Sequence, residues 1–269
     1  MIEDKSIKLV ICDCDGTILD DAKNLDSGLV KIIPELSKRG IIFSLASGRN
    51  IFLLLSIVDK LKIDSYYITD NGGNIYLKDQ RIISNSISRD YNNILNKYFS
   101  EHNIPFLMYT DKALHYFKKA EKLDIFKKRL IDKMSILPYN EYYDYSQESC
   151  FKMTLDSATI NNMSEVIEVV KKECPEINFK QSEGSLYTIT ACNATKGKAL
   201  VEICKMLDIS TEEVMAFGDN HNDSSLLDTA GTSVAMSNSE KELLESADYI
   251  CGDNNHNGVS EFIFKNLLK

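Results

Sequence analysis

In the stretch KLVICDCDGT, residues 8–17, an apolar run ends in two aspartates, Asp13 and Asp15. The run Leu9–Cys12 shows no alternation of apolar and polar residues, which is typical of a strand in a parallel sheet covered on both faces. Residues i and i+2 of an extended chain point to the same side, so the two carboxylates repel each other. Such a pair must take up a proton or bind a cation.

Strand-like and helix-like segments alternate in both end portions of the chain. Further apolar strands are expected at Ile41–Ala46, Tyr66–Ile68, Val214–Phe217, Ser233–Met236 and Tyr249–Cys251. Apolar residues recur at helical spacing in two sets, which are Leu29, Ile32, Ile33, Leu36 and Leu200, Ile203, Cys204, Leu207. Pro34 lies inside the first set and should kink that helix or move its start. The alternation predicts an α/β fold with a doubly wound parallel sheet.

The middle of the chain, from about Ser86 to Leu186, is richer in Lys, Asn and Tyr. It contains helical stripes and strand-like runs without the regular alternation of the two ends. Helices are expected around Tyr91–Tyr98 and Met163–Val170, and strands at Phe106–Tyr109, Phe151–Leu155 and Leu186–Thr190. We therefore predict an α+β domain at residues 84–188, inserted between core segments at residues 1–83 and 189–269.

Composition excludes several classes of function. The chain of 269 residues has a net charge of −9, which argues against a nucleic-acid partner because such a partner requires a basic face. No apolar stretch approaches the roughly 18 residues that cross a membrane. The seven cysteines are scattered and odd in number, which indicates reduced thiols in a cytoplasmic protein. Cys12 and Cys14 lack two further ligands at the spacing of a thiolate metal site. Oligomeric state is not encoded in any pattern that we recognise.

Acidic and hydroxyl side chains follow several of the predicted strands. Asp13, Ser47 and Asp219 each come directly after or close behind a different strand. Ligands bind at the carboxyl ends of the strands in an open parallel sheet, so these residues should meet at one edge. Oxygen ligands with open positions suit Mg²⁺ and a phosphate substrate. A calcium EF-hand loop is excluded, because Gly16 stands at the fourth position of its run and Asn24 at the twelfth.

Lys196 supplies the opposite charge near the start of a predicted helix. A helix N-terminus is already positive, so a lysine there is unfavourable by about 0.3–1 kcal/mol. An anion bound at that end would reverse the effect. The hydroxyl of Ser47 and the backbone amides around Gly48 offer neutral donors to the same anion. These residues predict a phosphate-binding site beside the acidic edge.

Four segments, in this order, resemble the motifs of the haloacid dehalogenase superfamily. They are Asp13-x-Asp15-Gly16-Thr17, Ser47-Gly48-Arg49, Lys196-Gly197 and Gly218-Asp219-x-x-Asn222-Asp223. An α+β insertion between the second and third motifs resembles the cap of the Cof-type phosphatases, and Asn71-Gly72 resembles another common feature of that group. The resemblance implies a Rossmann-like core with a cap domain that selects the leaving group.

The resemblance also implies the chemistry of the first motif. Asp13 would be the nucleophile that attacks phosphorus and forms an aspartyl-phosphate. Mg²⁺ would be held by Asp13, Asp219 and the backbone carbonyl of Asp15. The carboxyl group of Asp15 would protonate the leaving alcohol and later deprotonate the attacking water, and the first of these roles requires a raised pKa.

The remaining motif residues would bind or support the substrate. Lys196, Ser47 and Gly48 would hold the phosphoryl oxygens and stabilise charge in the transition state. The roles of the other residues stay open at this point, with two alternatives for each. Asp223 would orient Lys196 or a metal-bound water, and Asn222 would contact the substrate or Asp219. Arg49 would bind phosphate or form a structural ion pair, and Asn71 would contact the substrate or support the site.

The function implied is a Mg²⁺-dependent hydrolase that acts on phosphomonoesters of small metabolites, such as sugar phosphates or phosphorylated cofactors. One alternative is a phosphotransferase or phosphomutase, in which a second hydroxyl replaces water as the attacking group. Another is a signalling module of the response-regulator type, which is phosphorylated on aspartate without turnover. Its usual length is about half of this chain, and it lacks an acid at the position of Asp15. The sequence does not identify the substrate.

Overall fold

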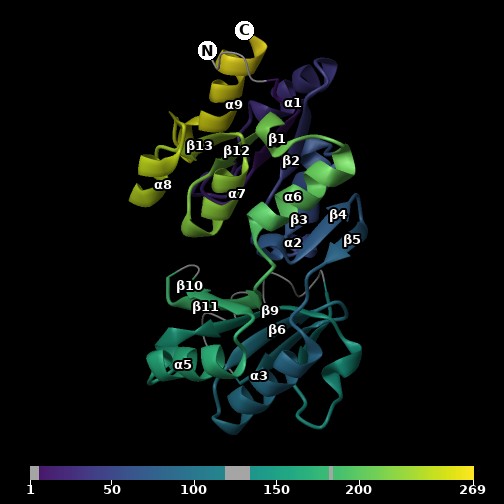
Figure 1. The fold of residues 1–269 in the computed structure, drawn as a ribbon, viewed down its shortest axis with the longest axis vertical. Helices are drawn as coiled ribbons and strands as arrows, with labels where there is room; N and C mark the ends of the chain where they lie inside the picture. The colour runs from purple at the N-terminus through teal and green to yellow at the C-terminus, as the bar shows by residue number, and fades with distance from the viewer. Residues whose placement is uncertain (1–5, 119–133, 182–183) are drawn as a thin grey trace. The chain divides into compact units, whose positions relative to one another are not determined.

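The computed structural model describes residues 6–118, 134–181 and 184–269. The chain separates into two compact units, which are traced in Figure 1. The first unit combines Met1–Ile83 with Thr195–Lys269, and the second is Ser84–Ala194. The predicted boundary after residue 188 would divide strand β11 (Leu186–Ala191), which pairs within the second unit. The boundary of the unit therefore lies beyond the end of that strand.

A five-stranded parallel sheet forms the centre of the first unit, with the strand order β14-β13-β12-β1-β2. In chain order, its strands are β1 (Leu9–Cys12), β2 (Ile42–Leu45), β12 (Val214–Gly218), β13 (Thr232–Met236) and β14 (Tyr249–Cys251). Cys12, the last residue of β1, stands opposite Phe217 on one side and Leu45 on the other. The carboxyl ends of the central strands therefore lie at one edge. The predicted parallel sheet is confirmed.

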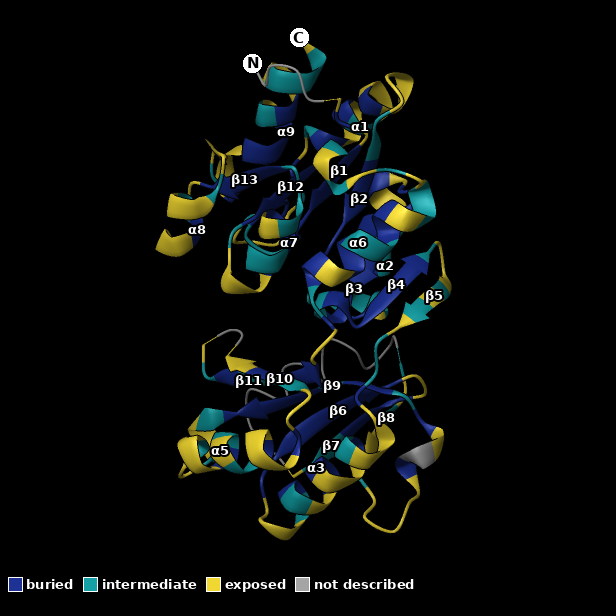
Figure 2. Cartoon of the chain, viewed as in Figure 1, coloured by how far each residue is buried: buried dark blue, intermediate teal, exposed yellow. Residues whose placement is uncertain are grey.

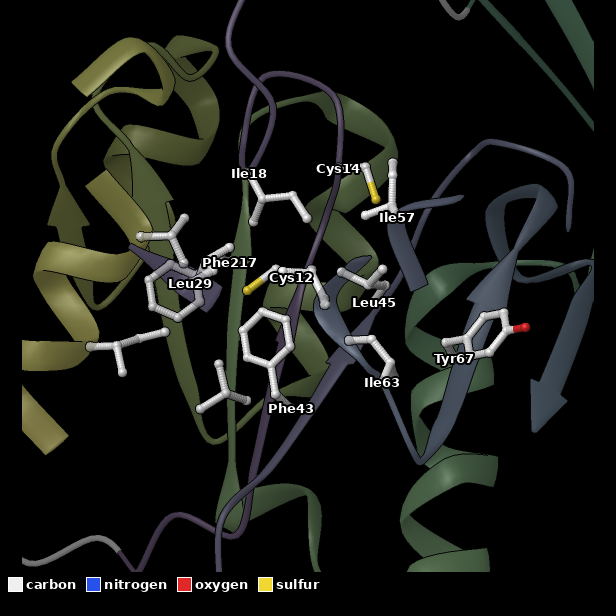
Figure 3. Close-up of a cluster of buried hydrophobic side chains, with 14 of the residues drawn as sticks. Cys12, Cys14, Ile18, Leu29, Phe43, Leu45, Ile57, Ile63, Tyr67 and Phe217 are labelled. Atoms are coloured by element: carbon white, nitrogen blue, oxygen red, sulfur yellow. The ribbon is translucent and has the colours of Figure 1, made fainter. Parts of the chain in front are cut away.

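Helices cover both faces of this sheet. One face packs against α1 (Leu29–Lys38), α2 (Ile51–Leu61) and α9 (Gly258–Ile263), and the chain ends in a π-helical turn, Phe264–Leu268. The other face packs against α6 (Lys196–Leu207), α7 (Ser224–Thr229) and α8 (Lys241–Ser246). Figure 3 shows side chains of the first face, including Cys12, Phe43 and Phe217. Alternate residues of each central strand supply the two cores, which explains why these strands are apolar throughout.

Strand β3 (Tyr66–Thr69) follows a different course from the other predicted strands. It touches the parallel sheet through a bridge between Ala46 and Ile68. Beyond that bridge it pairs antiparallel with β4 (Asn74–Leu77), and β5 (Gln80–Ser84) completes a three-stranded sheet. A short turn, Asp70–Gly72, joins β3 to β4. This small sheet places the turn beside the carboxyl end of β2.

The second unit contains a six-stranded sheet with the order β10-β11-β9-β6-β7-β8. Besides β11, its strands are β6 (Phe106–Thr110), β7 (Leu114–Phe117), β8 (Ile136–Pro138), β9 (Cys150–Asp156) and β10 (Ile177–Gln181). Helices α3 (Arg89–Glu101) and α5 (Met163–Glu173) pack on it through a shared apolar cluster. The inserted α+β domain is thereby confirmed. Within the described ranges, every helix is too short or too polar to span a bilayer.

Helix α1 illustrates how burial follows the sequence pattern. Leu29, Ile32 and Leu36 face the core, and the helix continues through Pro34. Val30, on the opposite side of the same helix, is 50% exposed. Figure 2 shows the same division over the whole unit, with buried strands and helices that are exposed on their outer sides.

Replacing Leu36 by alanine should therefore destabilise the protein far more than replacing Val30. Leu36 is fully buried, so Leu36→Ala should lower the free energy of unfolding by about 2–5 kcal/mol through lost burial and a residual cavity. Val30→Ala should change it by less than about 0.5 kcal/mol. Urea unfolding followed by circular dichroism measures both values. Equal losses in the two variants would contradict the assigned orientation of α1.

Candidate active site

Lys196 is the central cation of the site. It is the first residue of α6, and it is completely buried. Its Nζ atom donates hydrogen bonds of 2.5 Å to Oδ1 of Asp13 and 2.5 Å to Oδ1 of Asp223. Burial disfavours the charged ammonium, but the two carboxylates outweigh that effect and raise the pKa of Lys196. The lysine therefore stays protonated and joins the first and fourth predicted motifs.

A third carboxylate stands beside this pair. Ligand oxygens of Asp13, Asp219 and Asp223 all lie within 4.8 Å of one another. Burial and the nearby charge of Asp223 raise the pKa of Asp219 to about 7 and also raise the pKa of Asp13. One ammonium thus faces three acidic groups, and ionisation of all three would leave an excess of negative charge. This electrostatic environment favours the binding of a further cation.

The three carboxylates differ in how many hydrogen bonds they already accept. Asp223 accepts hydrogen bonds from the backbone amides of Asp219 and Asn220 through Oδ2, while its Oδ1 accepts from Lys196. Among the residues that the structure describes, Oδ2 of Asp13 and Oδ2 of Asp219 accept no hydrogen bond. A set of oxygen atoms with vacant lone pairs is the donor type that Mg²⁺ prefers. The residues present therefore fit a magnesium ion.

Asp15 occupies a different environment from Asp13. Its carboxylate accepts two hydrogen bonds of 2.7 Å from the guanidinium of Arg49 and one of 2.8 Å from Lys23. Partial burial opposes ionisation, but these two cations overcome it and lower the pKa of Asp15 to about 2. The direction is opposite to the raised pKa expected for a general acid. The reason is that Lys23 and Arg49 both converge on this carboxylate.

The second motif forms a loop next to the turn at Asp70–Gly72. Ser47 is buried, and its Oγ accepts a hydrogen bond from the backbone amide of Arg49. Asn71 extends its side chain to within hydrogen-bond distance of Asn222, whose Nδ2 donates to Oδ1 of Asn71 at 2.9 Å. The structure therefore brings residues of all four predicted motifs, together with Asn71, to one edge of the first unit.

Three contacting residues were missed by the sequence interpretation. Thr17 donates a hydrogen bond of 2.9 Å from Oγ1 to Asp219, Lys23 bonds to Asp15, and Asn238 donates to the backbone carbonyl of Gly16. Thr17 stood within the first motif and could have been chosen there. Lys23 and Asn238 lie in loops with no recognisable pattern, so the sequence held no signal for them.

Comparisons with known proteins agree with this fold. A family model described as haloacid dehalogenase-like hydrolase matches residues 10–263. The chain is 26% identical over 262 residues to the 5-amino-6-(5-phospho-D-ribitylamino)uracil phosphatase YcsE of Bacillus subtilis (strain 168), with 97% of this chain and 96% of that protein covered. It is 26% identical over 270 residues to the phosphatase YbjI of Escherichia coli (strain K12), named for the same compound, with 97% of each covered. The crystal structure of TM0651 from Thermotoga maritima matches with a TM-score of 0.84 and 26% identity, covering 96% of this chain and 97% of that one.

Gly72 should be intolerant of a side chain, because the turn that contains it packs against the start of α6. Its φ is +98°, and a Cβ atom would stand 2.2 Å from the backbone oxygen of Thr195. Gly40 also has a positive φ, +74°, but a Cβ atom there meets nothing within 4 Å. Both alanine variants should lose about 1–2 kcal/mol from the left-handed backbone. Gly72→Ala should lose at least about 1 kcal/mol more from overpacking.

Urea unfolding of the two variants measures this difference directly. A loss for Gly72→Ala no larger than that for Gly40→Ala would show that the turn and Thr195 are not in close contact.

Proposed function

The chain belongs to the haloacid dehalogenase-like hydrolase family, and from this we propose that it is a Mg²⁺-dependent phosphatase acting on phosphomonoesters of small metabolites. The observation that carries the proposal is the buried Lys196 bonded to both Asp13 and Asp223, with Asp219 beside them. A protonated lysine next to an aspartate at the edge of a parallel sheet provides a phosphate ligand and a nucleophile together.

Asp13 is the proposed nucleophile. One of its carboxylate oxygens attacks phosphorus, the bond between phosphorus and the leaving oxygen breaks, and an aspartyl-phosphate forms. Lys196 and the Ser47 hydroxyl donate hydrogen bonds to the phosphoryl oxygens, with the backbone of Gly48 beside them. Asp223 holds Lys196 in position through the 2.5 Å hydrogen bond between them.

Asp15 is the proposed acid and base. It gives a proton to the leaving oxygen in the first half of the reaction. In the second half it takes a proton from water, which attacks phosphorus, breaks the bond to Asp13 and releases inorganic phosphate. Its pKa of about 2 leaves it ionised, as the second role requires, but makes it a weak base while Arg49 and Lys23 are in contact with it. The first role requires the substrate to draw Asp15 away from Arg49 and Lys23, since those contacts keep it ionised.

Magnesium would be held by Asp13, Asp219 and the backbone carbonyl of Asp15. When bound, the ion would reduce the repulsion between the phosphoryl oxygens and the attacking carboxylate. The hydrogen bond from Thr17 keeps the Asp219 carboxylate oriented toward this position. The hydrogen bonds that Asp223 already accepts make it a support for Lys196 rather than a third acidic ligand.

The substrate class is supported by the relatives. YcsE and YbjI are named as phosphatases of 5-amino-6-(5-phospho-D-ribitylamino)uracil, a phosphorylated sugar alcohol joined to a heterocycle. We propose a substrate of the same broad kind, a small phosphorylated polyol or sugar. A panel that contains 5-amino-6-(5-phospho-D-ribitylamino)uracil and common sugar phosphates, assayed by phosphate release, would identify the preferred substrate.

All seven cysteines are free thiols, which supports a cytoplasmic location.

Phosphoryl transfer to a second hydroxyl would use the same residues as hydrolysis. The names of YcsE and YbjI favour hydrolysis, because both are called phosphatases. Measuring free inorganic phosphate against phosphorylated or isomerised product separates the two reactions.

Asp13→Asn should lower kcat for Mg²⁺-dependent phosphate release by at least about 10³-fold, because the side-chain amide of asparagine is not a nucleophile. The matched control is Asp64→Asn, whose side chain is 79% exposed on the same unit and which should retain full activity. Phosphate release is measured at saturating substrate, and circular dichroism checks that both variants are folded. Activity retained by a folded Asp13 variant would contradict the assignment.

Asp15→Asn should let the phosphorylated enzyme accumulate. The amide cannot deprotonate water, so breakdown of the aspartyl-phosphate should slow more than its formation when the leaving group needs no proton. Mass spectrometry after brief exposure to para-nitrophenyl phosphate should detect a phosphoryl adduct in this variant and little in the wild type. Rapid turnover without an adduct would show that Asp15 is not the base.

A further inference from the structure

We propose that Asn71 is a positioning residue, which fixes the phosphate-binding loop Ser47–Arg49 relative to the turn that carries Asp219, Asn222 and Asp223. The inference rests on the phosphatase function proposed above and extends it to a residue outside the four motifs. Three observations support it, namely the backbone conformation of the turn, its hydrogen bonds to the loop and the environment of the Asn71 amide.

The turn that contains Asn71 is held in a strained conformation. Asp70, Asn71 and Gly72 have φ values of 53°, 57° and 98°, so three successive residues are left-handed. Non-glycine residues are disfavoured in this region, and such strain persists only where surrounding contacts enforce it. The buried Asp70 supplies such contacts, since its Oδ2 accepts hydrogen bonds from the Thr69 hydroxyl at 2.9 Å and the Asn74 amide at 3.0 Å.

The strained turn directs two successive backbone amides at the phosphate-binding loop. The amide of Asp70 donates to the carbonyl of Arg49 at 2.9 Å, and the amide of Asn71 donates to the carbonyl of Ser47 at 3.0 Å. These two acceptors flank Gly48 on either side. The carbonyls of the loop are thereby tied back to β3 and the turn, which fixes the orientation of the peptide units at Gly48.

The side chain of Asn71 continues this connection to the fourth motif. Its Oδ1 accepts the 2.9 Å hydrogen bond from Asn222, and the same oxygen lies 2.9 Å from the position that a Cβ atom on Gly48 would occupy. The amide therefore fills the space between Gly48 and Asn222. Asparagine suits this position, because it tolerates the left-handed backbone and offers a neutral hydrogen-bond acceptor.

Loss of the side-chain amide of Asn71 should reduce the rate of the reaction more than the affinity for substrate. Catalysis requires the phosphate ligands and the nucleophile to be aligned closely, and a shift of about 1 Å can reduce the rate about 10²-fold. The substrate is also bound through contacts that do not involve Asn71. We therefore expect a fall in kcat of at least about tenfold, with KM changed by less than about threefold.

Asn71→Gly is the most informative variant, because glycine keeps the left-handed backbone and the amide donor but removes the side chain. The matched control is Lys78→Gly, which also replaces a left-handed residue, with φ of 57°, in the turn between β4 and β5. The control should keep wild-type kcat. Asn222→Ala should reduce kcat in the wild-type background. In the Asn71→Gly background it should reduce kcat by less than about a further twofold, because the side-chain amides of Asn71 and Asn222 act as one unit.

Hydrogen–deuterium exchange gives a readout that does not depend on activity. Peptides that cover residues 47–49 should exchange faster in Asn71→Gly than in the wild type or Lys78→Gly. Unchanged kcat and unchanged exchange in Asn71→Gly, or effects of Asn71 and Asn222 that multiply independently, would overturn the inference. The wild type could also show no phosphatase activity while amide exchange in residues 47–49 still increases in Asn71→Gly. That result would overturn the proposed function and leave the positioning role in place.

Discussion

The site depends on the convergence of Asp13, Asp219 and Asp223 at one edge of a parallel sheet, where a single buried ammonium offsets part of their charge. Buried carboxylates repel one another unless protons or cations intervene, and Lys196 supplies one positive charge to the group. Lys196 could not remain buried and protonated without its two carboxylate partners, and those partners could not lie so close without it. The repulsion that remains between the carboxylates favours a divalent ion and, through it, a phosphate.

Much of the fold was predictable because its central strands are buried on both faces. Runs such as Leu9–Cys12 are continuously apolar, and parallel strands align their carboxyl ends, so the residues that follow them had to meet. Asp13, Ser47 and Asp219 were located by that reasoning alone. Strand β3 was predicted, but its antiparallel sheet with β4 and β5 was not foreseen, because the turn between β3 and β4 uses a non-glycine left-handed pair.

The charge state of Asp15 could not be predicted from the sequence. Its partner Arg49 belongs to the second motif, and both an ion pair and a phosphate contact were open interpretations for it. Lys23 reaches the same carboxylate from a loop in which it adopts a left-handed conformation, with φ of 65°. A loop conformation of this kind leaves no periodic pattern. The pKa of Asp15 is lowered as a result, while that of Asp219, in the same site, is raised.

The dependence of the melting temperature on Mg²⁺ concentration tests most directly whether a divalent cation relieves the crowding of the carboxylates. A ligand that binds the folded state raises its stability by mass action, so the wild type should melt at progressively higher temperature as MgCl₂ is added at constant ionic strength. Asp228→Asn, an exposed control in α7, should behave in the same way. Asp219→Asn, which removes one carboxylate from the site, should show no such rise. A wild type that does not respond to Mg²⁺, or an Asp219 variant that responds equally, would contradict the magnesium site.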